Sequence, residues 1–312
     1  MTNNIVFVLS DARSGSTLLD QLLGANKDVV TIGEVHWLAA YVNQDRKIYN
    51  PIHPLVCSCG QTVSECMFWL RVEEAVGRPL ETLVLRPRII DKARSGQLPW
   101  KLFAWVGRRM KSFVEANPKY YKNSVCQKML DGQRIAADSI RLFDAIKAVS
   151  TAHCIIDSSK VAFRFRSVFE SVPERVRVIL LARDYRAVVH SKMNRGKTIE
   201  TAAVGWKQKT LQMEELTNDV PQGKIHRLKY EDFCNEPKTQ IQKLCAFLDL
   251  EFSNDMLLRP SAGLHHLGGS PSKFDKSKSE IRLDQRYLEA FSKSELQYLE
   301  RIVGDSARIW GY

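Results

Sequence analysis

The chain has 312 residues, of which 44% are hydrophobic and 26% charged. This content is enough to bury a full α/β core, and without an internal repeat or clean linker we expect one domain over residues 1–312. The sequence has no run of eighteen or more apolar residues and opens without a signal-peptide pattern, so we expect no transmembrane segment and a cytoplasmic protein. The compact, unadorned chain leads us to expect a bacterial source. The formal net charge is +11, but no recognised module accompanies it, so we expect no sequence-specific nucleic-acid binding. No pattern in the sequence specifies an oligomeric state.

The first predicted elements form a phosphate site. Residues 5–9 are an apolar run typical of a buried strand, and leucines at helical spacing over 18–23 predict a helix that Gly24 caps. The loop between them offers the unpaired N–H groups of a helix N-terminus, and Gly15 permits close approach of an anion. We therefore predict that phosphate is bound by Arg13, Ser14, Gly15, Ser16 and Thr17.

A kinase-type P-loop is the main alternative interpretation of this loop. That pattern requires GxxxxGK[ST], with a lysine before the hydroxyl that holds Mg²⁺. Here Gly15 is followed directly by Ser16 and Thr17, and the cation, Arg13, precedes the glycine. A nucleotide or nucleoside kinase using ATP and Mg²⁺ stays an alternative that the missing lysine disfavours.

A second apolar run over 29–32 leads into Gly33 and Glu34, with His36 close behind. We expect this strand to end near the first loop, which would bring Glu34 or His36 to the same site. The alternative is that Glu34 only starts a helix and that His36 is a packed or surface side chain.

Three of the seven cysteines cluster downstream of His53, at Cys57, Cys59 and Cys66. An odd number of cysteines in a reducing compartment argues against a disulfide framework. The four side chains could supply zinc ligands, but Cys-x-Cys is tighter than the usual finger spacing. We favour a packed loop without metal and keep structural zinc as the alternative.

The segment 86–134 carries twelve Lys and Arg residues but only three acidic ones, which is most of the excess positive charge. Apolar residues recur every three or four positions over 100–113 and predict an amphipathic helix. We expect a basic helical insertion over about 70–150 that covers the site and attracts an acidic peptide, an anionic glycan or a lipid headgroup. The alternative is an aromatic core with a solvated basic face.

Two later strands are predicted at 154–156 and 176–182. Open α/β sheets bind ligands at the carboxyl ends of their strands, which would place Lys160 and Arg183 at one edge. The residues after Arg183 have helical character, and Ser191 and Arg195 would share one helix face. The alternative for Lys160 is a solvated side chain behind a helix capped by Asp157.

Taken together, these segments resemble the PAPS-dependent sulfotransferases, where PAPS is 3′-phosphoadenosine 5′-phosphosulfate. Residues 13–17 are similar to the 5′-phosphosulfate loop of that family, and residues 183–191 are similar to its 3′-phosphate motif. The stretches 31–34, 156–160, 228–233 and 268–274 also fit, with motif spacing closest to the tyrosylprotein and carbohydrate types. The resemblance implies a three-layer, P-loop-like α/β fold, with a short parallel sheet flanked by helices and the basic insertion added.

The resemblance implies transfer of a sulfuryl group from PAPS to a hydroxyl acceptor, with PAP (3′-phosphoadenosine 5′-phosphate) as product and no metal required. The acceptor class stays open among peptidyl tyrosine, carbohydrate and a small alcohol or phenol. Arg13 and Lys160 would stabilise the developing charge, and Glu34 would be the general base. His36 is the rival base, because an unperturbed imidazole titrates near pKa ~6.5.

The same resemblance assigns further residues to the nucleotide. Arg183, Ser191 and Arg195 would bind the 3′-phosphate, while Tyr230 would contact the nucleotide, and a late loop with Ser270 and Lys273 would close over it. That loop reads Gly-Ser-Pro-Ser-Lys-Phe where the family commonly has Gly-Asn-x-x-Arg-Phe, so the sequence departs from the family pattern at Ser270 and Lys273. A non-catalytic binder of phosphorylated or sulfated ligands is a further alternative, which the presence of Glu34 and Lys160 disfavours.

Overall fold

The computed structural model describes residues 4–46, 54–87, 130–260, 263–274 and 281–312, with single positions between 113 and 128. His53 and most of the predicted amphipathic helix over 100–113 lie outside the described residues. Among the helices that are described, none combines the length and hydropathy needed to cross a membrane.

A five-stranded, all-parallel sheet forms the centre of the fold, which confirms the predicted α/β class. The strand order is β2-β3-β1-β4-β5, with β1 between β3 and β4. Four of the strands begin within a residue of an apolar run predicted from the sequence, whereas β5, with the sequence IHRLK, was not predicted. The strands are β1 (Asn4–Ser10), β2 (Val29–Gly33), β3 (Cys154–Asp157), β4 (Val176–Ala182) and β5 (Ile225–Lys229).

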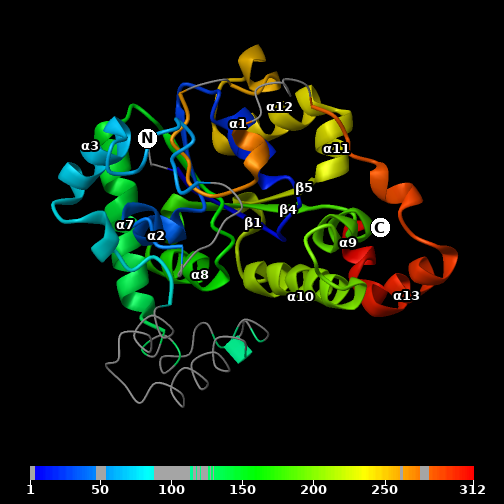
Figure 1. Ribbon diagram of the computed structural model, residues 1–312. Coiled ribbons are helices and arrows are strands. Elements are labelled where there is room, and N and C mark those ends of the chain that lie inside the picture. Colours follow the sequence, from blue (N-terminus) through cyan, green and yellow to red (C-terminus); the bar gives the residue numbers. More distant parts are fainter. Residues whose placement is uncertain are drawn as a thin grey trace.

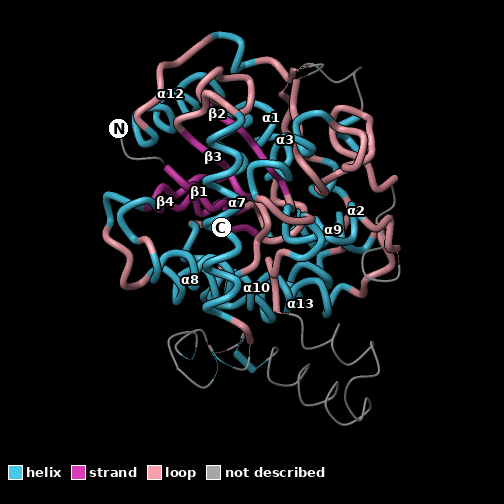
Figure 2. The backbone as a smooth tube through the Cα atoms, turned by 90° about the vertical axis from the view of Figure 1, so that its left-hand side faces the viewer, coloured by secondary structure: helices cyan, strands magenta, loops and turns pink. Residues whose placement is uncertain are grey.

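Helices cover both faces of the sheet (Figure 1), and the view turned by 90° shows the same layers (Figure 2). One face is covered by α1 (Ser16–Leu23), α11 (Tyr230–Asn235) and α12 (Pro237–Leu248). The other carries α8 (Ala162–Ser171) and α10 (Ile199–Thr217). The remaining helices are α2 (Leu38–Val42), α3 (Met67–Val76), α7 (Gly132–Val149), α9 (Tyr185–Met193) and α13 (Lys293–Val303).

The alternation of side chains along β1 explains the two layers. Ile5, Phe7 and Leu9 pack into the core that includes α8 and α10, whereas Val6 and Val8 pack against α1 and α12. All five side chains are buried, as expected for a central strand that is covered on both faces. Each contributes roughly 1.5–3 kcal/mol of hydrophobic stabilisation, so this strand is a main source of fold stability.

Two helices of the predicted insertion, α3 and α7, are described, and they pack against each other. Trp69 of α3 and Phe143 of α7 are fully buried in the same core as Phe7 of the sheet. These two helices are therefore part of the main core rather than only a cover over the site. The wider insertion over about 70–150 stays a prediction.

A buried ion pair supports the turn that follows β3. Arg164 of α8 and Asp157 at the end of β3 are both fully buried, and the guanidinium donates to the carboxylate. Arg164 Nε also donates to Ser139 Oγ at 2.9 Å. The second oxygen of Asp157 accepts a hydrogen bond from the backbone N–H of Ser159 at 2.8 Å. The pair therefore connects the α8 layer to the loop that carries Lys160.

We expect Arg164→Met to lower the free energy of unfolding by about 3–5 kcal/mol in urea titrations, because it leaves the Asp157 carboxylate buried without a cation. Arg175→Met is the matched control, since Arg175 pairs with a half-exposed Asp144 at 2.6 Å. An exposed pair contributes about 0–1 kcal/mol. Equal, small losses in both variants would contradict a structural role for the buried pair.

Candidate active site

The carboxyl ends of all five strands lie at one edge of the sheet, because the strands are parallel. Each strand is followed within a few residues by a side chain singled out from the sequence. Arg13 follows β1, Glu34 follows β2, and Lys160 follows β3; Arg183 and Tyr230 follow β4 and β5. The edge therefore collects cations, a carboxylate and an aromatic ring where α/β sheets bind ligands.

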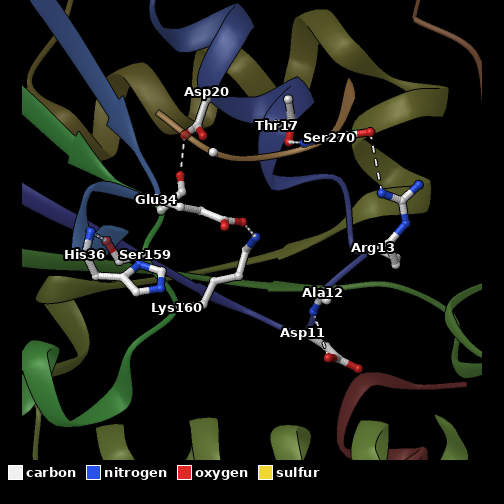
Figure 3. Close-up of polar contacts among 12 residues, drawn as sticks. Asp11, Ala12, Arg13, Thr17, Asp20, Glu34, His36, Ser159, Lys160 and Ser270 are labelled. Carbon is white, nitrogen blue, oxygen red and sulfur yellow. Dashed lines mark hydrogen bonds and ion pairs between the residues drawn. The ribbon is translucent and has the colours of Figure 1, made fainter. Parts of the chain in front are cut away.

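Arg13 joins the first loop to two distant segments. Its Nε donates to Ser191 Oγ on α9 at 2.9 Å, and its Nη1 donates to Ser270 Oγ at 3.4 Å. The backbone N–H of Ser270 donates to Thr17 Oγ1 at 3.0 Å (Figure 3). The predicted 5′-phosphosulfate loop, 3′-phosphate motif and late loop are thus in direct contact.

The N-terminus of α1 has the backbone form of an anion cradle. Gly15 is left-handed (φ +94°), and no side chain caps the helix. A Cβ at Gly15 would lie 2.3 Å from the Tyr230 ring, so the close approach of that ring requires glycine. Ser14 and Ser16 are buried, and Ser14 Oγ has no hydrogen-bond partner among the described residues. Free helix N–H groups and an unpaired hydroxyl suit a phosphate oxygen.

Arg183 lies across the same cradle. Its guanidinium carbon is 4.5 Å from the centroid of the Tyr230 ring, and its Nη1 donates to the carbonyl oxygen of Arg13 at 3.2 Å. Its Nη2 donates to the carbonyl oxygen of Asp284 at 3.2 Å and lies 3.8 Å from the Asp284 carboxylate. The buried Nε of Arg183 has no partner among the described residues, which leaves a donor available.

The prediction that Ser191 and Arg195 share one helix face is wrong. Helix α9 ends at Met193, so Arg195 lies beyond its end and is exposed. The turn contains Gly196 at φ +82°, a residue type that commonly ends helices. The charge of Arg195 still reaches the site. Burial lowers the pKa of Arg13, and the positive charges of Arg195 and Arg183 lower it further.

Glu34 and Lys160 form an ion pair at 2.9 Å, with both side chains largely buried. Glu34 directly precedes a 3₁₀ turn over Val35–Trp37, but its side chain does not cap that turn and faces Lys160 instead (Figure 3). Lys160 has φ +58°, a conformation that costs energy for a residue with a Cβ. The pair joins the ends of β2 and β3.

The late loop, which in the structure spans residues 263–274, packs directly on Glu34. The backbone N–H of Glu34 donates to the carbonyl oxygen of Leu267 at 2.7 Å, and the N–H of Leu267 donates to Ile32 at 3.1 Å. Gly268 has φ +66°, and a Cβ there would lie 2.6 Å from Glu34 Cβ. Lys273 Nζ donates to the Gly268 carbonyl oxygen at 2.7 Å, and burial lowers the pKa of Lys273 to about 8.

The comparison with protein families agrees with this geometry. The model described as "Sulfotransferase family" matches residues 5–254, which include all five strand-end residues named above. The chain belongs to the sulfotransferase family. This confirms the family predicted from the motifs.

Curated relatives of this sulfotransferase-family chain come from two worms, both named "Putative protein-tyrosine sulfotransferase". The Caenorhabditis briggsae protein is 33% identical over 87 residues, which are 25% of this chain and 31% of the relative. The Caenorhabditis elegans protein is 27% identical over 136 residues, which are 40% of this chain and 52% of the relative. The matches therefore span about a third and a half of these relatives.

Two solved structures share the fold of this sulfotransferase-family chain. The sulfotransferase domain of the Synechococcus PCC 7002 olefin synthase has a TM-score of 0.61 at 17% identity, covering 100% of this chain and 95% of that one. A sulfotransferase from Mycobacterium avium has a TM-score of 0.51 at 10% identity, covering 99% of this chain and 77% of that one. Both likenesses show the predicted P-loop-like fold.

His36 lies beside the Glu34–Lys160 pair of the sulfotransferase site. Its backbone N–H donates to Ser159 Oγ at 3.3 Å, and its ring centroid is 4.7 Å from that of Trp37. His36 and Lys160 also line a pocket of ≈ 200 Å³ together with Trp37 and Arg86. The rival base is thus also near the site.

Two acidic residues of the site were missed from the sequence, Asp284 beside Arg183 and Asp20 in α1. Asp20 is 3% exposed and accepts a hydrogen bond from Ser158 Oγ (Figure 3). Burial raises the pKa of Asp20 to about 7, and the nearby charges of Glu34 and Asp157 raise it too, against the opposing effects of Ser158 and Lys160. The signal in the sequence that could have identified Asp20 is its position as a single aspartate within the leucine-rich run 18–23.

We expect Asp20→Asn to change the pH dependence of stability of the sulfotransferase. The native carboxyl holds its proton up to about pH 7, while the unfolded one loses it near pH 3.8, so the wild type loses stability as pH rises between these values. The asparagine variant has no carboxyl to titrate, so its free energy of unfolding should not show this fall, which is at most about 1.4 kcal/mol per pH unit in the wild type. Urea titrations from pH 4 to 8 would contradict the prediction if both curves stayed parallel.

Proposed function

We propose that the chain is a PAPS-dependent sulfotransferase that transfers a sulfuryl group to an acceptor hydroxyl and releases PAP. One observation carries the proposal: Arg13 Nε bonds Ser191 Oγ at 2.9 Å, although the two phosphate motifs are 178 residues apart. The contact lies at the sheet edge that also carries the Glu34–Lys160 pair. Family membership supports the same reaction class.

The nucleotide would lie along the cradle between α1 and α9. Arg13 and the N-terminus of α1 would bind the 5′-phosphate, with Ser14 Oγ as an additional donor. Arg183, through its unpaired Nε, and Ser191 would bind the 3′-phosphate, and the charge of Arg195 would add to the attraction. Ser270 and Lys273 would cover the nucleotide from the late loop, which already bonds Thr17.

The Glu34–Lys160 pair supplies the chemistry of the transfer. The acceptor oxygen attacks sulfur, the bond from sulfur to the 5′-phosphate oxygen breaks, and its electron pair leaves with PAP. Lys160 would move from Glu34 to the sulfuryl oxygens, which frees the carboxylate to take the acceptor proton. Arg13 would stabilise the charge on the departing oxygen. These cations meet the electrostatic needs of the transfer, so we assign no metal to it.

The acceptor would enter through the pocket beside Lys160. Trp37 and Phe163 provide aromatic walls, and Arg86 lies with its guanidinium 4.5 Å from the Trp37 ring. This combination favours a phenolic hydroxyl with a negative group nearby, as in a tyrosine with acidic flanks. The names of the worm relatives agree with a tyrosine acceptor. A cytoplasmic location and a bacterial source stay predictions.

The nucleotide site is tested by calorimetric titration with PAP, ADP and AMP. We expect PAP to bind most tightly and Arg183→Ala to weaken PAP binding by about 10- to 100-fold, the value of one or two charged hydrogen bonds. AMP, which lacks the 3′-phosphate, should bind both proteins alike. Arg308→Ala removes an exposed arginine paired with Asp305 and should change nothing. An equal loss for PAP and AMP would reject the 3′-phosphate role of Arg183.

The general base is tested by Glu34→Gln, which keeps the size of the side chain. We expect turnover with an acidic tyrosine peptide to fall by about 10²–10⁴-fold, while PAP affinity stays within about twofold. Glu300→Gln, on the exposed side of α13, is the control and should keep full activity. Unchanged turnover in Glu34→Gln together with a large loss in His36→Gln would indicate that His36 is the general base.

A further inference from the structure

A second cluster of reactive side chains lies outside the transfer site. Cys57, Cys59 and Cys66 meet His265, which comes from the late loop 199 residues further along the chain than Cys66. One ligand atom from each of the four residues lies within 4.8 Å of the other three. We propose that these three thiolates and this imidazole bind one structural Zn²⁺ ion.

Four of the six separations between the ligand atoms are close to those of a tetrahedral zinc site, and the other two are within 4.8 Å. Zn–S bonds of about 2.3 Å and a Zn–N bond of about 2.0 Å require S···S distances near ~3.8 Å and S···N distances near ~3.5 Å. The Cys66 sulfur is 3.6 Å from that of Cys59 and 3.9 Å from that of Cys57. His265 Nδ1 is 3.3 Å from the Cys66 sulfur and 3.8 Å from the Cys57 sulfur.

The segments around the four ligands hold them in this arrangement. The Phe68 ring stacks on the His265 imidazole at 4.8 Å and 8° between the planes. Trp69 Nε1 donates to the carbonyl oxygen of His265 at 3.1 Å. Ser58 adds three bonds to the late loop: its Oγ donates to Leu264 at 2.6 Å, its N–H donates to His266 at 3.1 Å, and the N–H of His266 donates to Ser58 Oγ at 3.0 Å.

The donor set and its surroundings favour zinc in a closed, structural site. Three sulfurs and one imidazole nitrogen are a common structural zinc set, and four protein ligands leave no position for a substrate. Cys57 and Cys66 are buried, whereas Cys59 is exposed and gives the ion a path of entry. The sequence alone favours a metal-free loop, with His53 as the fourth ligand of the zinc alternative. Among the described residues the fourth ligand is His265, which comes from a part of the chain that spacing could not connect.

The consequence for the fold is a fixed late loop. His265 lies two residues before Leu267, which bonds the end of β2, and three before Gly268, which packs on Glu34. A metal at the cluster would therefore hold the loop that carries Ser270 and Lys273. This consequence for nucleotide binding rests on the proposed function, whereas the zinc site does not.

The metal content of the untagged full-length protein tests the proposal. We expect mass spectrometry of metals to find one zinc ion per chain, and Cys59→Ser and His265→Gln to reduce it by at least fivefold after dialysis against a mild chelator. Cys59 is exposed, so its replacement disturbs no packing. Cys245→Ser is the control, because Cys245 is a buried free thiol outside the cluster. It should keep its zinc.

Cobalt provides a readout that is independent of activity. Protein refolded with Co²⁺ in place of zinc should show sulfur-to-cobalt charge-transfer bands and the intense visible bands of tetrahedral Co²⁺, both lost in Cys59→Ser. Wild-type protein without stoichiometric zinc and without these bands would overturn the proposal. So would a count of five free thiols instead of seven in the denatured, metal-free chain, which would indicate a disulfide. Neither result depends on whether PAP binds.

Discussion

The parallel direction of the five strands is the constraint on which the rest of the structure depends. Because every strand runs the same way, each carboxyl end lies at the same edge, and the loops that leave it must share one small volume. The strand-end residues are far apart in sequence, yet the sheet alone brings them together: Arg13, Glu34, Lys160 and Arg183. The alternating pattern of β1 holds this edge in place, since it buries side chains on both faces.

This arrangement concentrates positive charge that the protein alone does not neutralise. Burial and the charges of Arg195 and Arg183 all lower the pKa of Arg13, which means that the protonated guanidinium is held at a cost. Asp284 offsets part of that cost, and the pKa of its carboxyl is lowered to about 2, first by hydrogen bonding to Arg286. Under the proposed function, this remaining positive potential would attract the two phosphate groups of the nucleotide.

Strands β1 to β4 and the residues that follow them could be predicted because each depends on a local pattern, whereas the mixed polar sequence of β5 has no such pattern. An apolar run such as 176–182 specifies a buried strand, and the residue after it must then lie at the edge. Side-chain pairing could not be predicted in the same way. Nothing near Lys160 in the sequence indicates that it bonds Glu34 rather than solvent, and His265 reaches the cysteines only through the path of the late loop. Gly196 indicates that α9 ends before Arg195, but the helix-face prediction rested on the spacing of Arg183, Ser191 and Arg195 and did not use that glycine.

The position of the late loop depends on contacts between residues far apart in sequence, whereas the sheet positions only the strand-end residues of the site. Three attachments fix it: Leu267 to β2, Ser270 to Thr17, and the 264–266 segment to Ser58 and the cysteine cluster. The first two depend on hydrogen bonds near the nucleotide cradle, which water and ligand oxygens can replace. Zinc–thiolate bonds are not exchanged so easily, so the third attachment is the one that persists when the cradle is empty. A loop held in this way loses little conformational entropy on binding, and its side chains meet the nucleotide already in place.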